Sequence, residues 1–500
     1  MPTIGNWLYK RAHASGNKTA VVYNDRRFTY AEVNCRVNRL ANGLLKLGIG
    51  KGDRVAAMLA NCNEIVEGLF ACAKVGAIFL PINCRLSAGE IEFMLADGAI
   101  PKALIYCESF SGLMDTVAGN VPIQNLIKVD RQAKSSEYES FLAAHSAAEP
   151  ECAVSEDDVH LIIYTSGTTG FPKGAMLTQA NIYWSMVQAL KAEPLFETDI
   201  TLTVAPLFHV AAIIILTFPL FYTGGTIVIH DKFDPEAILE RIEREKVTSV
   251  FMVPCMWRGI MQFLASSRHD ISSMRFGVVA GAPCPCDVIN FFNDKGVPLT
   301  QVLGMTEAPL ISMLKIEDAT RKIGSVGQPV VDIKVIGKDE SVVPQGEIGE
   351  LVIRGTSVIK GYWMRPEGTR QALIGGWFRT GDLVRVDEEG YLYVVGRKKD
   401  MIISGGENVY PAEVEQVMYQ HPEIKEVAVV GIPDEKWGES VKAVAVLKDT
   451  SCSLTIEDIR SFCEGKLAHY KIPKTLEVMT ALPRNPMGKL LKSALKGISG

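Results

Sequence analysis

The chain has 500 residues, of which 47% are hydrophobic and 22% are charged. These values exclude a disordered chain, a collagen and a coiled coil, and the length predicts about two to four folding units. With 52 Lys and Arg against 57 Asp and Glu the net charge is −5. This balance disfavours a dedicated nucleic-acid-binding protein, so we expect no nucleic-acid partner.

The first half of the chain alternates strand and helix patterns. Residues 29–32 fit a capping box, and the helix after it places Val33, Val37, Leu40 and Leu44 on one face. Buried strands are predicted at 54–59 and 77–80 around a helix at 63–75. The alternation then continues with strands at 161–164, 227–229, 249–253, 276–279 and 299–302, and with helices from about 181 and at 235–245. Such a series predicts α/β layers with largely parallel sheets.

Residues 210–222, VAAIIILTFPLFY, form the most apolar segment. The segment is shorter than the roughly 20 residues of a membrane helix, and Pro219 interrupts it. We therefore predict a buried core helix and no integral membrane segment, and we leave peripheral membrane contact open. The N-terminus has no continuous apolar stretch, so no signal peptide is expected.

From residue 348 the pattern changes to short alternating strands in GELVIRG, GWFRTGDLVRV and GYLYVVGR, with a hairpin turn at 387–390. After residue 400 we predict helices at 411–419 and 455–467, and strands at 427–431 and 441–447 on either side of a loop, PDEKWGES. The predicted fold class is α/β, with a large N-terminal domain of layered α/β sheets plus a β-rich subdomain, and a small mobile α+β C-terminal domain. The predicted domains are 1–397 and 398–500.

The eleven cysteines are an odd number, and none of them shows zinc-ligand spacing. This usage indicates a reducing compartment, and we expect a cytoplasmic location.

Residues 164–174, YTSGTTGFPKG, form a loop rich in Gly, Ser and Thr after a predicted strand. The glycines allow backbone N–H groups to approach an anion, and the hydroxyl groups and Lys173 add donors and charge. The pattern is not a Walker A loop, because Pro172 precedes the lysine and Gly174 follows it. A polyphosphate-binding loop is therefore predicted.

This run resembles the signature of the adenylate-forming (AMP-binding) superfamily, which includes acyl-CoA synthetases, aryl-CoA ligases, luciferases and peptide-synthetase adenylation domains. Further stretches match that superfamily in order: APLFH (205–209), AGAP (280–283), GMTE (304–307), FRTGDL (378–383), GRKKDMIISGGENVYPAEVE (396–415) and PRNPMGK (483–489). The chain is therefore identified as resembling an acyl-CoA synthetase or aryl-CoA ligase.

The resemblance implies two half-reactions. A carboxylate attacks the α-phosphorus of ATP to give an acyl-adenylate and pyrophosphate, and the thiol of coenzyme A then displaces AMP. It assigns Lys489 to the charge that develops on the α-phosphate, and it places Thr306 and Glu307 at the phosphates, with Glu307 helping to hold Mg²⁺. It assigns to ATP the residues Thr165, Ser166, Gly167, Thr168, Thr169, Lys173, Gly281, Ala282, Pro283, Leu303, Gly304, Asp382 and Arg397.

The resemblance implies more detail at three of these positions. Asp382 is expected to end its strand and to accept hydrogen bonds from both ribose hydroxyls, with Arg397 near the same sugar. Leu303 stands where the family usually has an aromatic residue that stacks on adenine. An apolar contact therefore replaces stacking on the base.

The C-terminal residues are assigned by resemblance to a domain rotation. Lys399 occupies the hinge position, and the rotation removes Lys489 from the site. It brings Ser404, Gly405 and Gly406 to the thiol channel, where two glycines allow close approach to a pantetheine arm.

His209 is expected next to the substrate carboxylate. Val210, Ala211, Phe251, Val302 and Gly304 are the expected pocket walls. These walls contain no acid that could hold an amino-acid ammonium group, so we predict an apolar monocarboxylic acid, aromatic or medium-chain.

Three hypotheses stay open from the residues alone: a ligase that makes acyl-CoA, an enzyme that loads a carrier protein, and a nucleotide-binding protein without turnover. Intact Lys489, Glu307 and Asp382 favour the first two. The oligomeric state is also open, with a homodimer as one alternative.

Overall fold

The computed structural model describes residues 3–97, 100–130, 136–165, 172–449, 452–484 and 490–496. The chain divides into two compact units, the first of Met1–Asp332 with Ile353–Phe378 and the second of Ile333–Val352 with Arg379–Gly500. It passes from one unit to the other within strands β16 (Asp332–Ile336), β17 (Gly349–Arg354) and β20 (Trp377–Val386). The domain boundary predicted at 397 and 398 falls inside the second unit and stays a prediction.

The first unit contains a sheet whose described part has nine strands, in the order β15-β14-β13-β12-β11-β9-β10-β1-β2. Its central strands are parallel, as predicted, and the edge strands β2, β14 and β15 are antiparallel to their neighbours. The strands are β1 (Thr19–Tyr23), β2 (Arg26–Thr29), β9 (Ile200–Thr203), β10 (Thr226–Ile229), β11 (Ser249–Met252), β12 (Phe276–Ala280), β13 (Leu299–Met305), β14 (Ala308–Met313) and β15 (Gln328–Pro329).

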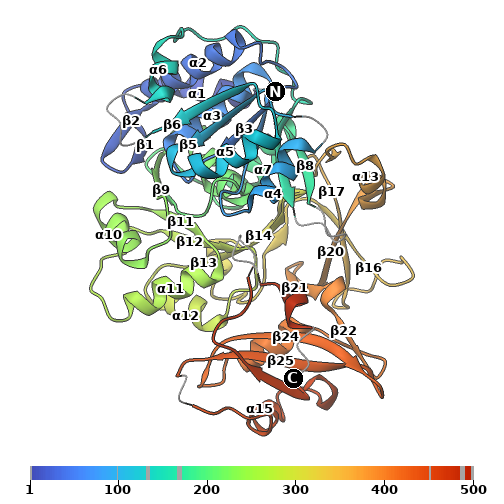
Figure 1. Cartoon of the computed structure of the whole chain (residues 1–500). Helices are drawn as coiled ribbons and strands as arrows, with labels where there is room; N and C mark the ends of the chain where they lie inside the picture. Colours follow the sequence, from blue (N-terminus) through green and yellow to red (C-terminus); the bar gives the residue numbers. More distant parts are fainter. Residues whose placement is uncertain are drawn as a thin grey trace. The chain divides into compact units, whose positions relative to one another are not determined.

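Three helices cover one face of this sheet, α10 (Pro235–Glu245), α11 (Pro254–Leu264) and α12 (Cys286–Asp294) (Figure 1). Their buried side chains, among them Ile238, Trp257 and Phe292, pack with Val250 and Val279 of the strands. Removal of this apolar surface from water stabilises the unit by roughly 25 cal/mol per Å².

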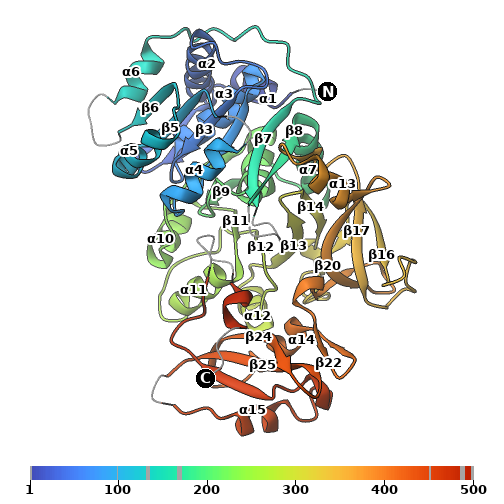
Figure 2. The same cartoon turned by 45° about the vertical axis from the view of Figure 1, so that its right-hand side comes forward.

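The second sheet of the first unit runs β18-β8-β7-β4-β3-β5-β6. Helices α4 (Ala88–Ala96) and α5 (Ser111–Asn120) pack on one of its faces (Figure 2). Helix α3 (Asn63–Val75) packs against β3 and β4, and α1 (Ile4–Ala14) and α2 (Tyr30–Lys46) pack on α3. The strands are β3 (Arg54–Met58), β4 (Ile78–Pro81), β5 (Ala103–Cys107), β6 (Asn125–Val129), β7 (Val159–Thr165), β8 (Lys173–Thr178) and β18 (Gly361–Tyr362).

Several helix predictions are confirmed to the residue. The predicted helices 63–75 and 235–245 are α3 and α10. Thr29 accepts from the backbone N–H of Glu32 as the N-cap of α2, and the Glu32 side chain completes the predicted capping box. The further helices of this unit are α6 (Glu137–Ala143), α7 (Gln179–Ala192), α13 (Pro366–Ala372) and the 3₁₀ turns Glu108–Phe110 and Ile316–Asp318.

The apolar segment 210–222 is buried as predicted, but it is not one regular helix. It consists of α8 (Val210–Ala212), a π-helical stretch (Ile213–Thr217) and α9 (Phe218–Thr223). Two local features accompany the departure from regular α-helix. Pro219 has no N–H to donate to the carbonyl of residue 215, and the Thr217 hydroxyl donates to the Ala212 carbonyl oxygen at 2.7 Å. Nowhere in the described ranges is a helix both long and apolar enough to cross a membrane.

A third sheet lies in the part of the chain for which a β-rich subdomain was predicted. Its strand order is β16-β17-β20-β19, with β21 paired to β20. Its remaining strands are β19 (Leu373–Ile374) and β21 (Leu392–Arg397). The Asp387 N–H donates to the Tyr391 carbonyl at 3.0 Å, which closes the predicted hairpin. Asp382 lies inside β20 and not at its end, which corrects the expectation for this residue.

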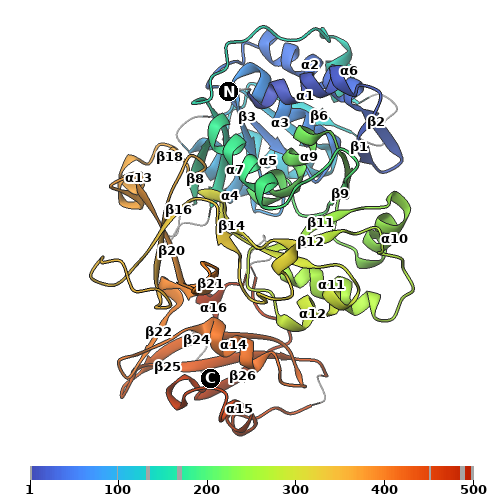
Figure 3. The same ribbon diagram turned by 180° about the vertical axis from the view of Figure 1, so that it is seen from behind.

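The C-terminal part of the second unit is a sheet in the order β23-β22-β25-β24, with β26 parallel to β25 (Figure 3). Helices α14 (Pro411–Met418) and α15 (Ile456–Cys463) pack on one face. Leu482 and, from helix α16 (Lys492–Leu495), Leu495 belong to a second core. The strands are β22 (Ile402–Ser404), β23 (Glu407–Val409), β24 (Ile424–Asp434), β25 (Gly438–Leu447) and β26 (Thr475–Val478). The α/β fold class is confirmed.

Two predictions for this part of the chain, one for a loop and one for the end of a helix, are wrong. The loop PDEKWGES is mostly strand, because the β24–β25 ladder continues to the pair Asp434↔Gly438. Helix α15 ends at Cys463 rather than at 467, because the chain leaves helical geometry at Glu464, whose backbone is extended.

Candidate functional site

Most predicted site residues of the first unit lie at one edge of the nine-stranded sheet. Strands β9, β11, β12 and β13 are parallel, so their carboxyl ends meet at the same edge, where ligands bind in open α/β sheets. Phe251 lies near the end of β11, the exposed residues Gly281, Ala282 and Pro283 follow β12, and Val302, Leu303 and Gly304 lie near the end of β13. The structure therefore gathers segments that are up to about a hundred residues apart in the chain.

The loop APLFH follows β9 at this edge and is held by Asn61, which is 4% exposed. The Asn61 amide oxygen accepts from the Leu207 backbone N–H at 2.8 Å, and its amide nitrogen donates to the Ala205 carbonyl at 3.0 Å. Asn61 was not predicted from the sequence. A signal was present, since Asn61 lies two residues after the predicted buried strand 54–59 and a polar side chain there needs partners.

His209 is the last residue of this loop and is the N-cap of α8, which contacts β13. Burial lowers the pKa of His209 to about 4, and the positive charge of Arg85 acts in the same direction. Its Nε2 atom is buried and has no hydrogen-bond partner among the described residues. Next to it Val210 is buried and Ala211 is partly exposed. The loop thus presents a neutral imidazole with an unused nitrogen beside apolar walls.

Thr306 and Glu307 form the turn between β13 and the antiparallel strand β14. Glu307 is 7% exposed, and its Oε1 atom accepts from the Tyr362 hydroxyl at 2.8 Å. Burial, and then the Glu307 charge, raise the pKa of Tyr362 well above its ordinary value. Tyr362 was not predicted, because it lies 55 residues from Glu307 in the chain.

The donor set at this turn fits Mg²⁺. A Mg²⁺ ion bound through one or two carboxylates and the substrate phosphates needs no protein cage. In the described ranges no group of three or more His, Cys, Asp or Glu residues could hold a metal ion. The Glu307 carboxylate is a hard oxygen donor of the kind that Mg²⁺ prefers, and it would be the residue to hold the ion. A bound Mg²⁺ would neutralise phosphate charge.

The phosphate loop is described only at its two ends. Thr165 ends β7 and pairs with Lys173, which begins β8, and the Thr165 hydroxyl lies 3.4 Å from the Lys173 carbonyl oxygen. The Lys173 ammonium lies 5.5 Å from the centre of the Tyr362 ring. The predicted residues Ser166, Gly167, Thr168 and Thr169 lie outside the described residues.

The remaining predicted residues belong to the second unit. Asp382 and Arg397 pair across the β20–β21 ladder, and Arg397 Nε lies 2.9 Å from Asp382 Oδ1. Lys399 lies in a 3₁₀ turn, Lys398–Asp400. Next to it, Lys398 lies 2.8 Å from Glu350, which is also 3.4 Å from Arg379. The predicted Lys489 lies outside the described residues.

Ser404, Gly405 and Gly406 join β22 to β23, and Gly405 lies against Trp437. Gly405 has φ +62°, and a Cβ atom there would lie 2.7 Å from the indole. Trp437 is 42% exposed, and the ammonium groups of Lys436 and Lys474 lie 4.9 and 4.6 Å from its ring. An exposed indole between two cations suits a base that carries phosphates. Trp437 was not among the predicted residues, although it lies in the DEKWGES segment.

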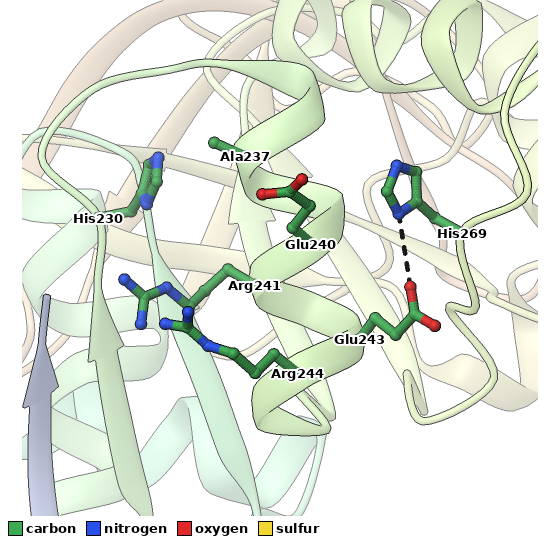
Figure 4. Close-up of a pocket in the computed structure, with 7 residues that line it drawn as sticks. All are labelled: His230, Ala237, Glu240, Arg241, Glu243, Arg244 and His269. Carbon is green, nitrogen blue, oxygen red and sulfur yellow. Dashed lines mark hydrogen bonds and ion pairs between the residues drawn. The ribbon is translucent and has the colours of Figure 1, made fainter. Parts of the chain in front are cut away.

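One hollow of about 420 Å³ in the described part of the first unit is separate from these residues. It lies along α10 and is lined by His230, Ala237, Glu240, Arg241, Glu243, Arg244 and His269 (Figure 4). Glu243 faces His269 at 3.4 Å, and both arginines lie within 3.5 Å of Glu245. It contains no predicted site residue.

Comparisons with known proteins agree with the fold. The AMP-binding enzyme family matches residues 8–363, and the AMP-binding enzyme C-terminal domain matches 413–489. A feruloyl-CoA synthase of an Amycolatopsis species is 41% identical over 496 residues, 99% of this chain and 98% of its own. A long-chain-fatty-acid–CoA ligase of Mycobacterium tuberculosis is 38% identical over 505 residues, with 99% and 98% covered.

A similar solved structure is that of the o-succinylbenzoate coenzyme A synthetase of Bacillus subtilis, in complex with ATP and a magnesium ion. It matches with a TM-score of 0.86 and 33% sequence identity, and the match covers 98% of this chain and 99% of that chain. The chain therefore belongs to the AMP-binding enzyme family. This confirms the resemblance inferred from the motifs, and with it the predicted enzyme class, an ATP-dependent AMP-forming carboxylate–CoA ligase.

Proposed function

We propose that this protein activates an apolar monocarboxylic acid, aromatic or medium-chain, as an acyl-adenylate and transfers the acyl group to coenzyme A. The observation that carries the proposal is the carboxyl edge of the nine-stranded sheet. There a neutral His209 with apolar neighbours, the exposed Gly281–Pro283 segment and the Glu307 turn follow the parallel strands β9, β12 and β13 of one sheet. A carboxylic acid, a purine and a polyphosphate with its Mg²⁺ are the ligands that these groups suit.

The residues expected around the acid favour an apolar substrate. Val210, Phe251 and Val302 are buried, and His209 is neutral at physiological pH, so it can donate one hydrogen bond without adding charge. The relatives named above, a feruloyl-CoA and a long-chain-fatty-acid–CoA ligase by name, bracket the aromatic and the aliphatic alternatives.

The role of each residue toward ATP belongs to the same proposal. Lys489 supplies the cation at the α-phosphate, Thr306 and Glu307 hold the phosphates and Mg²⁺, and Asp382 with Arg397 holds the ribose. A cation is effective at the α-phosphate because charge grows there in the transition state. Lys399 serves as the hinge, and Ser404–Gly406 receives the pantetheine arm.

Coenzyme A rather than a carrier protein is the proposed acceptor. The exposed Trp437 between Lys436 and Lys474, beside Gly405, suits the adenine and phosphates of coenzyme A. A carrier-bound pantetheine arm has no adenine to stack on this indole.

The test is ATP–pyrophosphate exchange with a panel of aromatic and C6–C12 aliphatic acids, followed by thioester formation with coenzyme A or with a pantetheinylated carrier. We expect exchange that depends on the acid and AMP release that depends on coenzyme A. The Lys489→Ala variant should lose exchange yet still convert a supplied acyl-adenylate to the thioester. Equal loss of both steps would contradict the role of Lys489, and exchange without any acid dependence would contradict the whole proposal.

Location and assembly complete the proposal. None of the eleven cysteines, all of which lie in described ranges, forms a disulfide, which supports a reducing compartment such as the cytoplasm. A homodimer is the assembly to test by sedimentation.

A further inference from the structure

Residues 359–365, which we name the clasp, cross the base of the phosphate loop within the first unit. The Ile359 N–H donates to the Glu307 carbonyl at 2.8 Å, and the Trp363 N–H donates to the Gly174 carbonyl at 2.7 Å. Between them, β18 pairs with β8 through Gly361↔Met176 and Tyr362↔Ala175 (Figure 3). The clasp therefore joins the Glu307 turn to the strand that begins at Lys173.

The clasp is also fastened to the strand on the other side of the phosphate loop. Asp97, whose side chain is 5% exposed, forms an ion pair with Arg365 at 2.5 Å. Its second carboxylate oxygen accepts from the Tyr164 hydroxyl at 3.0 Å, and its carbonyl accepts from the Trp363 indole N–H at 3.0 Å. Because Tyr164 lies in β7, both strands that flank the loop are tied to the clasp.

Gly174 shows how closely the clasp approaches. A Cβ atom on Gly174 would lie 2.8 Å from Ile162 and 3.3 Å from the Trp363 side chain. A larger residue here would push the clasp away from β8. Close packing against the clasp is thus one reason for a glycine at this position, beside the approach of a phosphate group that the sequence predicts.

Tyr362 is the side chain of the clasp that reaches the site. Its hydroxyl donates to Glu307 Oε1 at 2.8 Å, its ring faces the Lys173 ammonium at 5.5 Å, and its backbone N–H donates to the Thr369 hydroxyl at 2.9 Å. The other Glu307 oxygen, Oε2, has no hydrogen-bond partner in the part of the chain that the structure describes. One side chain thus contacts both the loop lysine and the turn carboxylate.

We propose that Tyr362 is a positioning residue, which holds the Glu307 carboxylate so that its second oxygen faces the Mg²⁺ of MgATP. This inference rests on the proposed function, in which Glu307 binds that ion. A carboxylate tied at one oxygen keeps its orientation, whereas an untied one samples several rotamers and binds metal less well. Because β18 pairs with β8, the clasp fixes the backbone of Tyr362. The position of β8 thereby sets the orientation of the Tyr362 hydroxyl and, through it, of the Glu307 carboxylate.

The test is Tyr362→Phe, which removes the hydroxyl and keeps the ring that faces Lys173. We expect the Mg²⁺ concentration for half-maximal ATP–pyrophosphate exchange to rise about 10- to 100-fold, the range for loss of a group that orients a metal ligand. A second readout needs no turnover: the melting temperature with ATP alone and with ATP plus Mg²⁺. Mg²⁺ should add stabilisation in the wild type and much less in Tyr362→Phe, while the effect of ATP alone stays.

Two further variants make the outcome decisive. Tyr138→Phe is the matched control, because its hydroxyl donates to the buried Glu67 carboxylate at 2.7 Å and should leave both Mg²⁺ readouts unchanged. Glu307→Gln tests the underlying function: if Mg²⁺ dependence stays normal there, the metal role of Glu307 is wrong. If Glu307→Gln shifts Mg²⁺ dependence and Tyr362→Phe does not, only the role of Tyr362 is wrong. A general loss of stability affects both melting measurements of a variant alike, so the difference between them still decides.

Discussion

Arg397 and Asp382 face each other across the β20–β21 ladder, with Arg397 Nε 2.9 Å from Asp382 Oδ1. The Asp382 side chain is 5% exposed and the Arg397 side chain 36%. The backbone N–H of Asp382 also donates to the Thr380 hydroxyl at 3.1 Å, and that hydroxyl donates to the Leu351 carbonyl at 2.7 Å. The two residues assigned to the ribose are thus oriented before any nucleotide arrives.

We predict that Asp382→Asn raises the KM for ATP in pyrophosphate exchange by about 10- to 100-fold, the loss expected for a hydrogen bond to a charged group. The KM for the acid should stay within about twofold, because the pair belongs to the ribose contact. Asp332→Asn, which disturbs an exposed pair with Arg354 at 3.1 Å, is the matched control. Equal effects of the two variants would contradict the assignment.

Trp437→Ala should raise the KM for coenzyme A by about 5- to 100-fold, since stacking on an aromatic ring contributes about 1–3 kcal/mol per base. Pyrophosphate exchange should not change, because adenylation does not involve coenzyme A. Trp184→Ala removes an indole of similar exposure, 38% against 42%, from another surface and should leave the KM unchanged. A normal KM for coenzyme A in Trp437→Ala would show that the indole does not bind it.

Asn61→Asp replaces the amide nitrogen that donates to the Ala205 carbonyl by an acceptor, and thereby places a carboxylate against carbonyl oxygens. We expect the APLFH loop to move and the KM for the acid to rise about tenfold or more, equivalent to about 1.4 kcal/mol, with the KM for ATP little changed. Asn42→Asp is the control, because Asn42 also donates to two carbonyls, of Ser146 and Ala148. A rise in both KM values alike would indicate general damage instead.

His160 makes stability depend on pH. Burial lowers the pKa of His160 from 6.5 to about 3, against a smaller opposing effect of the Ala77 backbone. Between these values the unfolded chain binds more protons than the folded chain, so stability that is complete above pH 6.5 falls as the pH drops toward 3. The contribution lost between pH 7 and pH 5 is about 2 kcal/mol.

The measurement is urea unfolding at pH 7 and pH 5 for the wild type and His160→Asn. The variant is less stable at pH 7 because it leaves a cavity, but its loss between the two pH values should be smaller by that amount. The same loss in both proteins would show that His160 does not carry the pH dependence.

The local order of the chain was predictable where the pattern of apolar residues is periodic and has clear ends. Helices α3 and α10 have such patterns, and their predicted bounds match. The stretch Ile213–Thr217 is apolar throughout, so no periodicity distinguishes a π-helix from an α-helix there. The β24–β25 ladder continues through polar residues as far as Asp434↔Gly438, and pairing of exposed polar strands leaves no signal in either segment alone.

The sequence indicated residues of this sheet edge where one short motif carries them, as in APLFH, AGAP and GMTE, and their roles stay predictions. Their placement at one sheet edge follows from parallel strand order, which alternation of strands and helices predicts. Asn61 and Tyr362 were missed because each acts on a motif far along the chain, at Leu207 and Glu307. A hydrogen bond over such a separation depends on topology, which the residues next to either partner do not specify.

The late position of the clasp in the chain has a consequence for biosynthesis. Strand β8 is made nearly two hundred residues before its partner β18, so a nascent chain that has left the ribosome only as far as β17 still lacks the contacts at Gly174, Asp97 and Glu307. Such a chain can complete the nine-stranded sheet, but the contacts that join the Glu307 turn to β8 and to Asp97 form only after residue 365 emerges. A product that ends upstream of this point therefore exposes the β8 edge that β18 covers in the full-length protein.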